Sequence, residues 1–525
     1  MAHSHRSPAL ARRQLLLGAA ALAGAATSAR SAASGAHEPV VETMAGKVRG
    51  VIDAGVAVFR GLRYGAPTHR FERPEPGAPW SGVRDAHEFG RSAPQHRTAD
   101  GGIWASWTFP WPTSEDCLFL NVWTRSPDRR EKRPVMVWLH GGGFAHGSGS
   151  DGLYDGARLA ARGDVVVVTV NHRLNAFGYT YFGDAGGARY ADAGNVGNLD
   201  IVLALKWVRE NIAAFGGDPN RVTLFGESGG GFKISVLMAM SAAQGLFRRA
   251  IVQSGSTLMV RTPDEALATT RKLMAALDLR PDQVEALAAA PTDRVLAATY
   301  RAGANGGPVV DGRSLARQPW TPGAPELSKD VPLLVGTMKD ETRGLVGQSD
   351  PSLFALTWDA LPARLQPSLT PRGLQAEAVV AAYRQAHPQF TPTDVFFSAT
   401  TEVGMRRNAI IQAERKAAQG GAPVFMYQEA WGTPAEGGKF RAMHSLDVPL
   451  VFDNVGRAAS LVGDGAPEAQ KVADAMSDAW LRFAKTGDPG WRAYTPSSRT
   501  TMVFDVASRS VDDPGREERL IFAQA

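Results

Sequence analysis

Short apolar runs, many of them β-branched, recur along the chain and alternate with longer stretches that have helical periodicity. Runs of four to six residues with few polar interruptions are typical of strands covered on both faces of a sheet. They lie at 135–139, 165–170, 222–225, 250–253, 331–335 and 424–427. Because strand and helix alternate, the pattern predicts an α/β fold with a mainly parallel sheet and right-handed crossovers.

The clearest helix is predicted between the second and third runs. In 198–215 the apolar residues recur every three or four positions, which suits a helix that lies on a sheet. Gly-Gly-Asp-Pro at 216–219 then ends this helix. Alanine-rich stretches at 264–300 and 374–418 predict further helices between later strands, and we expect them to form a cap over the carboxyl edge of the sheet.

The first 33 residues have the order of zones that is typical of a bacterial export signal. Arg12 and Arg13 precede an apolar run at 15–26, and small residues follow it. Paired arginines resemble the twin-arginine type, so we expect a protein that is periplasmic or secreted. A membrane anchor is the alternative, but the run is shorter than the ~20 apolar residues that span a bilayer. We therefore expect no stable membrane span, with cleavage after Ala29, Ala33 or Ala36.

Composition and charge narrow the choice of partners only slightly. The chain has 525 residues and a formal net charge of +5, and three of its arginines lie in the first 29 residues, which contain no acid. The remainder is close to neutral and has no cluster of Lys and Arg, so we expect no nucleic-acid partner. Cys117 is the only cysteine, which excludes an intrachain disulfide. Such a cysteine is more often a buried apolar residue than a nucleophile.

A Gly-Glu-Ser-Gly-Gly segment at 226–230 directly follows the apolar run 222–225 and precedes a helical pattern at 232–240. The string G-x-S-x-G is weak evidence by itself in a chain with 56 glycines. Its place between strand and helix is informative, because small residues beside Ser228 let the backbone turn sharply and expose the hydroxyl. The start of the helix also favours an anion formed there. The segment therefore indicates a nucleophilic serine.

A nucleophilic serine needs a general base and an acid, which in this type of fold follow it in the order acid, histidine. Of eleven histidines only His387 and His444 follow Ser228. We favour His444, which follows the run 424–427 in a glycine-rich loop, whereas His387 lies at a predicted helix end. Position leaves three candidates for the acid, which are Asp340, Glu341 and, in an Asp-Gly sequence typical of a turn, Asp311.

Three consecutive glycines, in His-Gly-Gly-Gly-Phe at 140–144, follow the run 135–139. Their N–H groups, together with the amide of Gly229, would give a set of donors for negative charge on a carbonyl oxygen. A flexible turn and a phosphate-binding loop are the alternatives. Neither a G-K-[ST] nor a G-x-G-x-x-G spacing begins at these glycines, so we expect no nucleotide cofactor.

Together these segments and others resemble the type-B carboxylesterases, the family of the bacterial para-nitrobenzyl esterases and the cholinesterases. The matching segments are 59–65, 115–123, 140–144, 171–174, 194–200, 207–219, 222–230, 253–255, 339–341, the segment around His444, and 483–489. The resemblance implies an α/β-hydrolase fold in a single catalytic domain at 34–525, with helices on both faces of the sheet. It also implies a carboxylic ester hydrolase that forms an acyl-enzyme with a small-molecule ester and needs no metal or organic cofactor.

The resemblance also implies the role of each site residue. It makes Ser228 the nucleophile, Glu341 the acid and His444 the base, and so chooses among the acids that position left open. It makes Gly142, Gly143 and Gly229 the oxyanion donors, and Ser254 and Asp447 residues that support the acid and the base; ordinary hydrogen-bonded polar residues are an equal alternative for these two. Amidase, carbamate hydrolase or thioesterase activity at this site is an alternative function. A non-catalytic binding protein of the same fold is another, and the retained nucleophile, acid, base and glycine loop argue against it.

Three positions depart from the family pattern. The usual cysteine partner of Cys117 would lie near Ala93, so no disulfide holds the loop 94–116. Gly229 replaces the common alanine after the nucleophile, and Asp447 stands where glutamate is usual. The loop also carries four aromatic residues, which either line the entrance to the site or belong to the core. They are Trp104, Trp107, Phe109 and Trp111.

Overall fold

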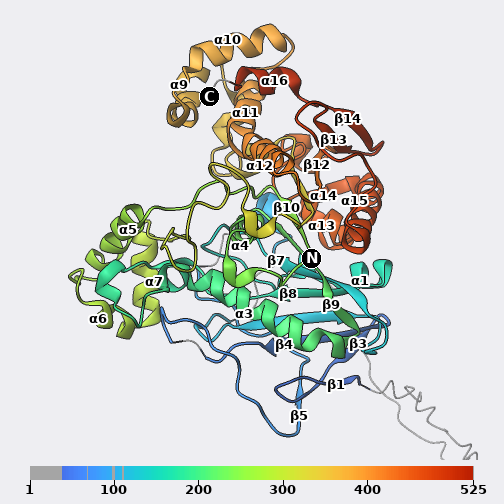
Figure 1. Cartoon of the computed structure of the whole chain (residues 1–525). Coiled ribbons are helices and arrows are strands. Elements are labelled where there is room, and N and C mark those ends of the chain that lie inside the picture. Colours follow the sequence, from blue (N-terminus) through green and yellow to red (C-terminus); the bar gives the residue numbers. More distant parts are fainter. Residues whose placement is uncertain (1–37, 68, 97–100, 109–111, 524–525) are drawn as a thin grey trace, which may run out of the picture. The chain divides into compact units, whose positions relative to one another are not determined.

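A mainly parallel sheet organises the structure, a computed structural model that describes residues 38–523 except 68, 97–100 and 109–111 (Figure 1). The predicted export signal lies outside the described residues. Eleven described strands form this sheet in the order β14-β13-β12-β11-β10-β9-β7-β8-β6-β4-β3. Their bounds are β3 Val51–Asp53, β4 Val56–Arg63, β6 Phe119–Thr124, β7 Arg133–Leu139, β8 Val166–Val170, β9 Gly217–Glu227, β10 Arg249–Gln253, β11 Leu333–Met338, β12 Val424–Glu429, β13 Thr500–Phe504 and β14 Arg509–Asp512.

The seven strands from β8 through β13 in this order run parallel, and the strands at both ends of the sheet are antiparallel to their neighbours. All six predicted apolar runs overlap parallel strands, which confirms the sheet prediction. A second sheet of three short strands was not predicted; its strands are β1 Val40–Glu42, β2 Lys47–Arg49 and β5 Val83–Asp85.

Helices cover both faces of the large sheet, because alternate residues of each strand point to opposite sides. In β7, Val135 and Val137 belong to one apolar core, together with Leu205 of helix α3. Trp138 points to the other core, where Trp480 of helix α15 also lies. The helices that follow the early strands are α1 Ala157–Gly163, α2 Asn175–Tyr179, α3 Val196–Asn211 and α4 Gly229–Leu237. Those after β12 are α13 Asp447–Val451, α14 Ala459–Val462, α15 Ala466–Thr486 and α16 Arg516–Ile521.

The two alanine-rich stretches form inserted helices, as predicted, but not all of these belong to a cap. Figure 1 shows α5 to α7 as one group and α9 to α11 beside α16 as another, and each group has its own small apolar core. Helix α12 differs, because its small residues Ala409 and Ala413 pack into the main core of the sheet. The bounds are α5 Pro263–Ala275, α6 Val284–Ala289, α7 Thr292–Arg301, α8 Glu341–Leu345, α9 Leu361–Leu369, α10 Ala376–Ala386, α11 Pro392–Thr401 and α12 Arg407–Ala418.

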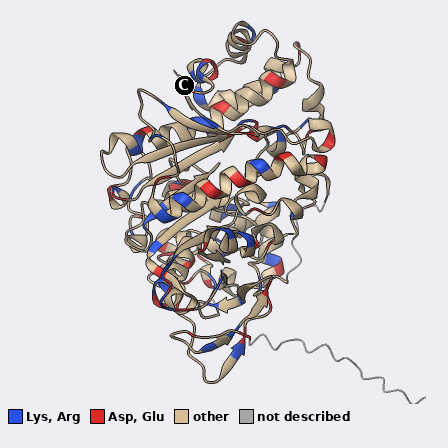
Figure 2. Cartoon of the chain, turned by 90° about the vertical axis from the view of Figure 1, so that its right-hand side faces the viewer, with Lys and Arg blue, Asp and Glu red and all other residues tan. Residues whose placement is uncertain are grey.

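Charged residues of both signs are interspersed over the ribbon in Figure 2, in keeping with the nearly balanced charge of this part of the chain. Several form ion pairs between elements, such as Arg162 of α1 with Asp474 and Asp478 of α15. Within the described residues, no helix combines the length and the apolar character needed to cross a membrane.

Candidate active site

Ser228 lies at the sharp turn between β9 and α4, as the sequence predicts. Its backbone has φ +51° and ψ −117°, which is rare for a residue with a side chain and marks a strained turn. The flanking glycines are required, since a Cβ at Gly226 would lie 2.7 Å from the carbonyl oxygen of Leu139 and one at Gly230 only 1.8 Å from it. Ser228 is half-buried between buried neighbours. The turn thus exposes this residue at the carboxyl end of the central strand.

Glu341 is the first residue of α8 and follows β11 after two intervening residues, and its side chain is fully buried. Its Oε1 accepts hydrogen bonds from the hydroxyl of Ser254, at 2.6 Å, and from the N–H of Met338, at 2.9 Å. Its Oε2 lies 2.5 Å from Nδ1 of His444. Two donors therefore hold one carboxylate oxygen while the other is directed at the imidazole.

The rejected candidates from the sequence have other partners. Asp340 accepts a hydrogen bond from Nε of Arg343 at 3.2 Å. Asp311 accepts two backbone N–H groups of its own turn, as expected for an Asp-Gly turn. His387 follows the end of α10, and its Nε2 lies 3.0 Å from Oε1 of Glu518. Glu341 and His444 are therefore the acid and imidazole that the structure brings together.

The other side of the His444 ring faces a carboxylate that sequence reasoning missed. Nε2 lies 3.1 Å from Oε1 of Glu227, the residue directly before Ser228, and this oxygen also accepts the hydroxyl of Ser445 at 2.5 Å. In the described part of the chain no hydrogen bond joins Nε2 to the Ser228 hydroxyl. The structure thus brings the imidazole to the residue next to the nucleophile. A charged residue at the buried end of an apolar strand was the available signal.

Burial and charge oppose each other at the imidazole. Burial disfavours the imidazolium, but the carboxylates of Glu227 and Glu341 outweigh it and raise the pKa of His444 to about 9. Burial raises the pKa of Glu227 to about 7, although His444 opposes this shift. The site therefore stabilises the imidazolium, the form that arises when a histidine takes a proton from a serine.

Ser254 and Asp447 hold different places in this network. Ser254 binds the acid directly, whereas Oδ2 of Asp447 accepts the side-chain amide of Gln253, at 2.9 Å, and the hydroxyl of Tyr427, at 3.1 Å. Gln253 in turn accepts the indole N–H of Trp480 at 3.0 Å. Asp447 thus ties the start of α13, three residues after His444, to the sheet and to α15.

The glycine loop after β7 lies against the start of α4. Gly142 and Gly143 have φ +84° and +61°, a conformation that favours glycine. A Cβ at Gly229 would lie 2.4 Å from the backbone nitrogen of Gly143 and 2.2 Å from its carbonyl oxygen. Within the described residues the N–H groups of Gly142 and Gly143 donate to no protein group. Two of the predicted donors, Gly143 and Gly229, are therefore in backbone contact, and the third, Gly142, directly precedes Gly143.

The loop without a disulfide partly belongs to the core. The rings of Trp104 and Trp107 lie 5.3 Å apart and pack against the apolar core around α15, and the Trp107 indole donates to the Tyr154 hydroxyl at 3.2 Å. Cys117 is buried, and burial raises the pKa of its thiol far above the ordinary value, as expected for an unreactive cysteine. The other two aromatic residues, Phe109 and Trp111, lie outside the described residues.

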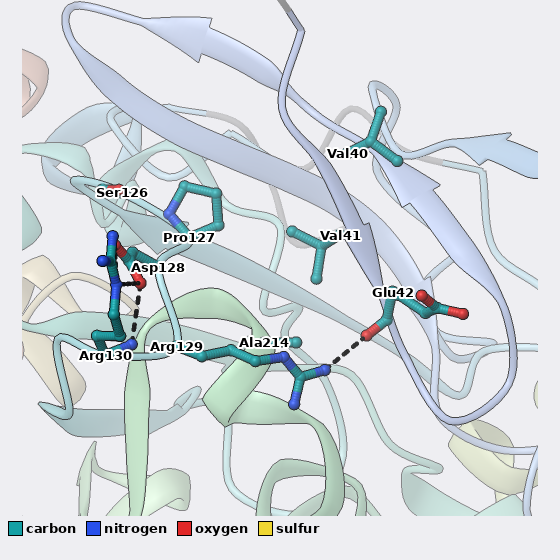
Figure 3. Close-up of a pocket in the computed structure, with 9 residues that line it drawn as sticks. All are labelled: Val40, Val41, Glu42, Ser126, Pro127, Asp128, Arg129, Arg130 and Ala214. Atoms are coloured by element: carbon teal, nitrogen blue, oxygen red, sulfur yellow. Dashed lines mark hydrogen bonds and ion pairs between the residues drawn. The ribbon is translucent and has the colours of Figure 1, made fainter.

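The structure also has an open surface depression of about 490 Å³, and Figure 3 shows the residues that line it. Ser126–Arg130 precede β7 and Ala214 precedes β9, so the depression is at the amino ends of these strands, whereas Ser228 follows the carboxyl end of β9. Its charged residues include the exposed ion pair of Arg130 with Asp128. It holds no nucleophile with a histidine. Among the described residues, no cluster of three or more His, Cys, Asp or Glu has the arrangement of a metal site.

Comparison with known proteins gives one consistent result over the length of the chain. The model of the Carboxylesterase family matches residues 37–523. Para-nitrobenzyl esterase of Bacillus subtilis (strain 168) is 36% identical over 499 residues, which cover 91% of this chain and 97% of that protein. Phenmedipham hydrolase of Pseudarthrobacter oxydans is 32% identical over 91% of this chain and 96% of that protein. The crystal structure of a Geobacillus stearothermophilus carboxylesterase at pH 6.2 gives a TM-score of 0.81 at 38% identity, covering 92% of this chain and 99% of that chain.

Proposed function

The chain belongs to the carboxylesterase family and is a carboxylic ester hydrolase of the α/β-hydrolase fold, and from this premise we propose that Ser228 is its nucleophile, Glu341 its acid and His444 its general base. One observation carries the proposal: Nδ1 of His444 is bound to Glu341, and the opposite side of the ring faces the residue next to Ser228. With Nε2 brought to the Ser228 hydroxyl, this is the arrangement that a serine needs to lose its proton as it attacks.

In the first half of the reaction, Oγ of Ser228 adds to the ester carbonyl carbon and its proton passes to Nε2 of His444. Glu341 accepts the N–H of Nδ1, which keeps Nε2 free to act as base and stabilises the imidazolium. The carbon–oxygen bond to the alcohol then breaks, and His444 returns the proton to the leaving alkoxide. An acyl-enzyme on Ser228 remains, which water cleaves with His444 again as base.

The negative oxygen of each tetrahedral intermediate is proposed to accept hydrogen bonds from the N–H groups of Gly142, Gly143 and Gly229. Donors fixed in place before the reaction stabilise the developing charge without reorganisation, and each such donor contributes about 10²–10³ in kcat. The contact between Gly143 and Gly229 supports a shared site for these donors.

The proton transfer requires Nε2 of His444, which contacts Glu227 in this structure, to reach the serine hydroxyl as well. Catalytic hydrogen bonds are often long in structures without substrate and shorten in the complex. We propose that a small rotation of the Ser228 side chain on substrate binding makes this contact, while Glu227 remains beside the ring.

Substitution of Ser228 by alanine tests the nucleophile. We expect S228A to lower kcat for para-nitrophenyl acetate by about 10⁴-fold or more, because the attacking oxygen is lost. A fluorophosphonate probe should label the wild-type protein on the peptide that contains residue 228 and should not label S228A. S241A, which changes an exposed serine just after α4, is the control and should behave as the wild type. Labelling of S228A at the wild-type stoichiometry would refute the assignment.

A panel of substrates separates the alternative functions. Relatives named as esterases support a small-molecule ester as the substrate. The panel consists of an ester, a thioester, a carbamate and an anilide that carry the same aromatic ring. We expect the ester to give the highest kcat/KM. A higher value with the anilide would instead identify an amidase.

A further inference from the structure

Lys233 is the only charged residue of α4, the helix that begins directly after Ser228, and its side chain is completely buried. Lysine is almost never fully buried without a partner. Here the ammonium has no carboxylate within ion-pair distance among the described residues. It instead donates hydrogen bonds to the carbonyl oxygen of Gly143, at 2.7 Å, and to that of His140, at 3.2 Å.

These two carbonyl groups lie at the two ends of the glycine loop. Within this loop, Gly142 and Gly143 adopt positive φ angles and have no side chains that could fix the loop by packing. The ring of Phe144, which follows the loop, lies 5.6 Å from the Lys233 ammonium and covers it. One buried side chain therefore binds the residues at both ends of the glycine segment, while the carbonyl oxygen of Gly142 accepts the N–H groups of Ala145 and His146.

Gly229 and Lys233 lie on the same face of α4, because they are four residues apart. A Cβ at position 229 would lie 2.2 Å from the carbonyl oxygen of Gly143, the same atom that Lys233 binds. The alanine that is common after the nucleophile in this family would thus push the loop away from α4. Gly229 admits the loop and Lys233 holds it there.

Lys233 can bind the two carbonyl groups in either of its protonation states. Burial lowers the pKa of Lys233 to about 7, with Glu227 opposing the shift, and both the ammonium and the neutral amine can donate to a carbonyl oxygen. The stacked imidazoles of His140 and His172, 4.8 Å apart, are neutral because burial lowers their pKa, so they do not repel the ammonium.

We propose that Lys233 is the positioning residue of the oxyanion hole: by binding the carbonyl groups of His140 and Gly143, it holds the N–H groups of Gly142 and Gly143 where the ester oxygen becomes negative. The proposal rests on the proposed function, because it assumes attack by Ser228. In its ammonium form, Lys233 also favours the negative intermediate.

Lys233→Met keeps the length of the side chain and removes the donor. We expect kcat for para-nitrophenyl acetate to fall at least about tenfold, with KM changed less than about twofold, because the lost interaction acts on the intermediate. The inhibition constant of a trifluoromethyl ketone, whose carbonyl oxygen becomes negative when Ser228 adds to it, should weaken by the same factor. Lys233→Gln, which restores a donor, should recover part of both losses.

Lys416 provides a matched control. It is also a buried lysine, on α12, and donates to the carbonyl oxygens of Ser328, at 2.9 Å, and Lys329, at 2.6 Å. Lys416→Met should lower the unfolding temperature but leave kcat and the inhibition constant of the trifluoromethyl ketone unchanged. The proposal would be overturned if K233M had the wild-type kcat and ketone inhibition constant. It would also be overturned if K416M lost as much of both as K233M.

A double-mutant cycle tests whether Gly229 and Lys233 act on the same loop. G229A alone should lower kcat by displacing Gly143. The kcat of the double variant G229A/K233M should be little lower than that of the less active single variant. Additive losses would contradict a shared action. If K233M does not fold, K233Q and G229A provide the same comparison. Ketone inhibition that survives in S228A would show that the proposed nucleophile is wrong, whatever the Lys233 variants do.

Discussion

The carboxylate of Glu227 occupies the side of the His444 ring that a general base presents to its substrate. Its negative charge stabilises the imidazolium, but it also competes with the serine hydroxyl for Nε2. The hydroxyl of Ser445 binds the same carboxylate oxygen and so limits its movement. The protonation of this pair therefore controls how much of the enzyme is ready to react.

Glu227→Gln should shift the pH dependence of the enzyme. Removing the charge destabilises the imidazolium, so the pKa of His444 falls from its raised value and the neutral base persists to lower pH. The acid limb of the kcat/KM profile should therefore move to lower pH. The profile is measured with a para-nitrophenyl ester between pH 5 and pH 10. Glu429→Gln changes another fully buried acid, which is not among the groups that shift His444, and should leave the limb in place. A shift to higher pH in E227Q would contradict this account.

The sequence predicts the residues whose chemistry has a local signal. Ser228 follows from a strand, a glycine-flanked turn and a helix, and His444 from its order in the chain. Glu227 and Lys233 could not be assigned in this way, because their partners lie 217 and 90 residues away. An isolated charge in an apolar segment shows that a partner exists, but only the fold shows which one.

At the scale of elements, one buried ion pair joins the segment after β8 to helix α3. Arg173 and Asp200 are both buried and lie 2.6 Å apart, and the guanidinium also donates to the carbonyl oxygen of Glu72 at 2.7 Å. The pair therefore connects three segments on one face of the sheet. Burial raises the pKa of Asp200, and Arg173 opposes that shift.

Asp200→Asn should destabilise the fold strongly, because it leaves the guanidinium buried without its counter-charge. Breaking a buried pair in this way costs about 3–5 kcal/mol of unfolding free energy. Urea unfolding followed by tryptophan fluorescence measures the loss. Asp282→Asn removes an acid that pairs with Arg280 in an exposed position and should leave the urea midpoint unchanged. Equal midpoints for D200N and the wild type would show that the buried pair is not required.

Elements were predicted where the apolar pattern is long enough. The six runs became parallel strands, and 198–215 became α3 followed by the short 3₁₀ helix Ile212–Phe215. The strands of three residues, such as β1 and β5, are too short to show a period. The sequence also could not show that α12 packs on the sheet rather than in the cap, since that depends on which strand face it meets.

At the scale of the whole molecule, we propose that the chain is exported through its first 33 residues, which lie outside the described part. Replacing Arg12 and Arg13 together by lysine keeps the charge but changes the paired arginines, and should leave the uncleaved precursor in the cytoplasm. Cell fractionation and intact mass measure this, with cleavage expected after residue 29, 33 or 36. Arg6→Lys is the control outside the pair. Unchanged periplasmic activity in the double variant would contradict a twin-arginine signal.

The network behind the imidazole extends almost to the end of the polypeptide. Trp480 binds Gln253, and Gln253 binds Asp447, so residues from three distant stretches complete one arrangement. During translation, the ribosome must therefore release more than nine-tenths of the chain before these partners can meet. A chain that is terminated before residue 480 therefore lacks the Trp480 contact to Gln253, and with it part of the support for the Asp447 segment.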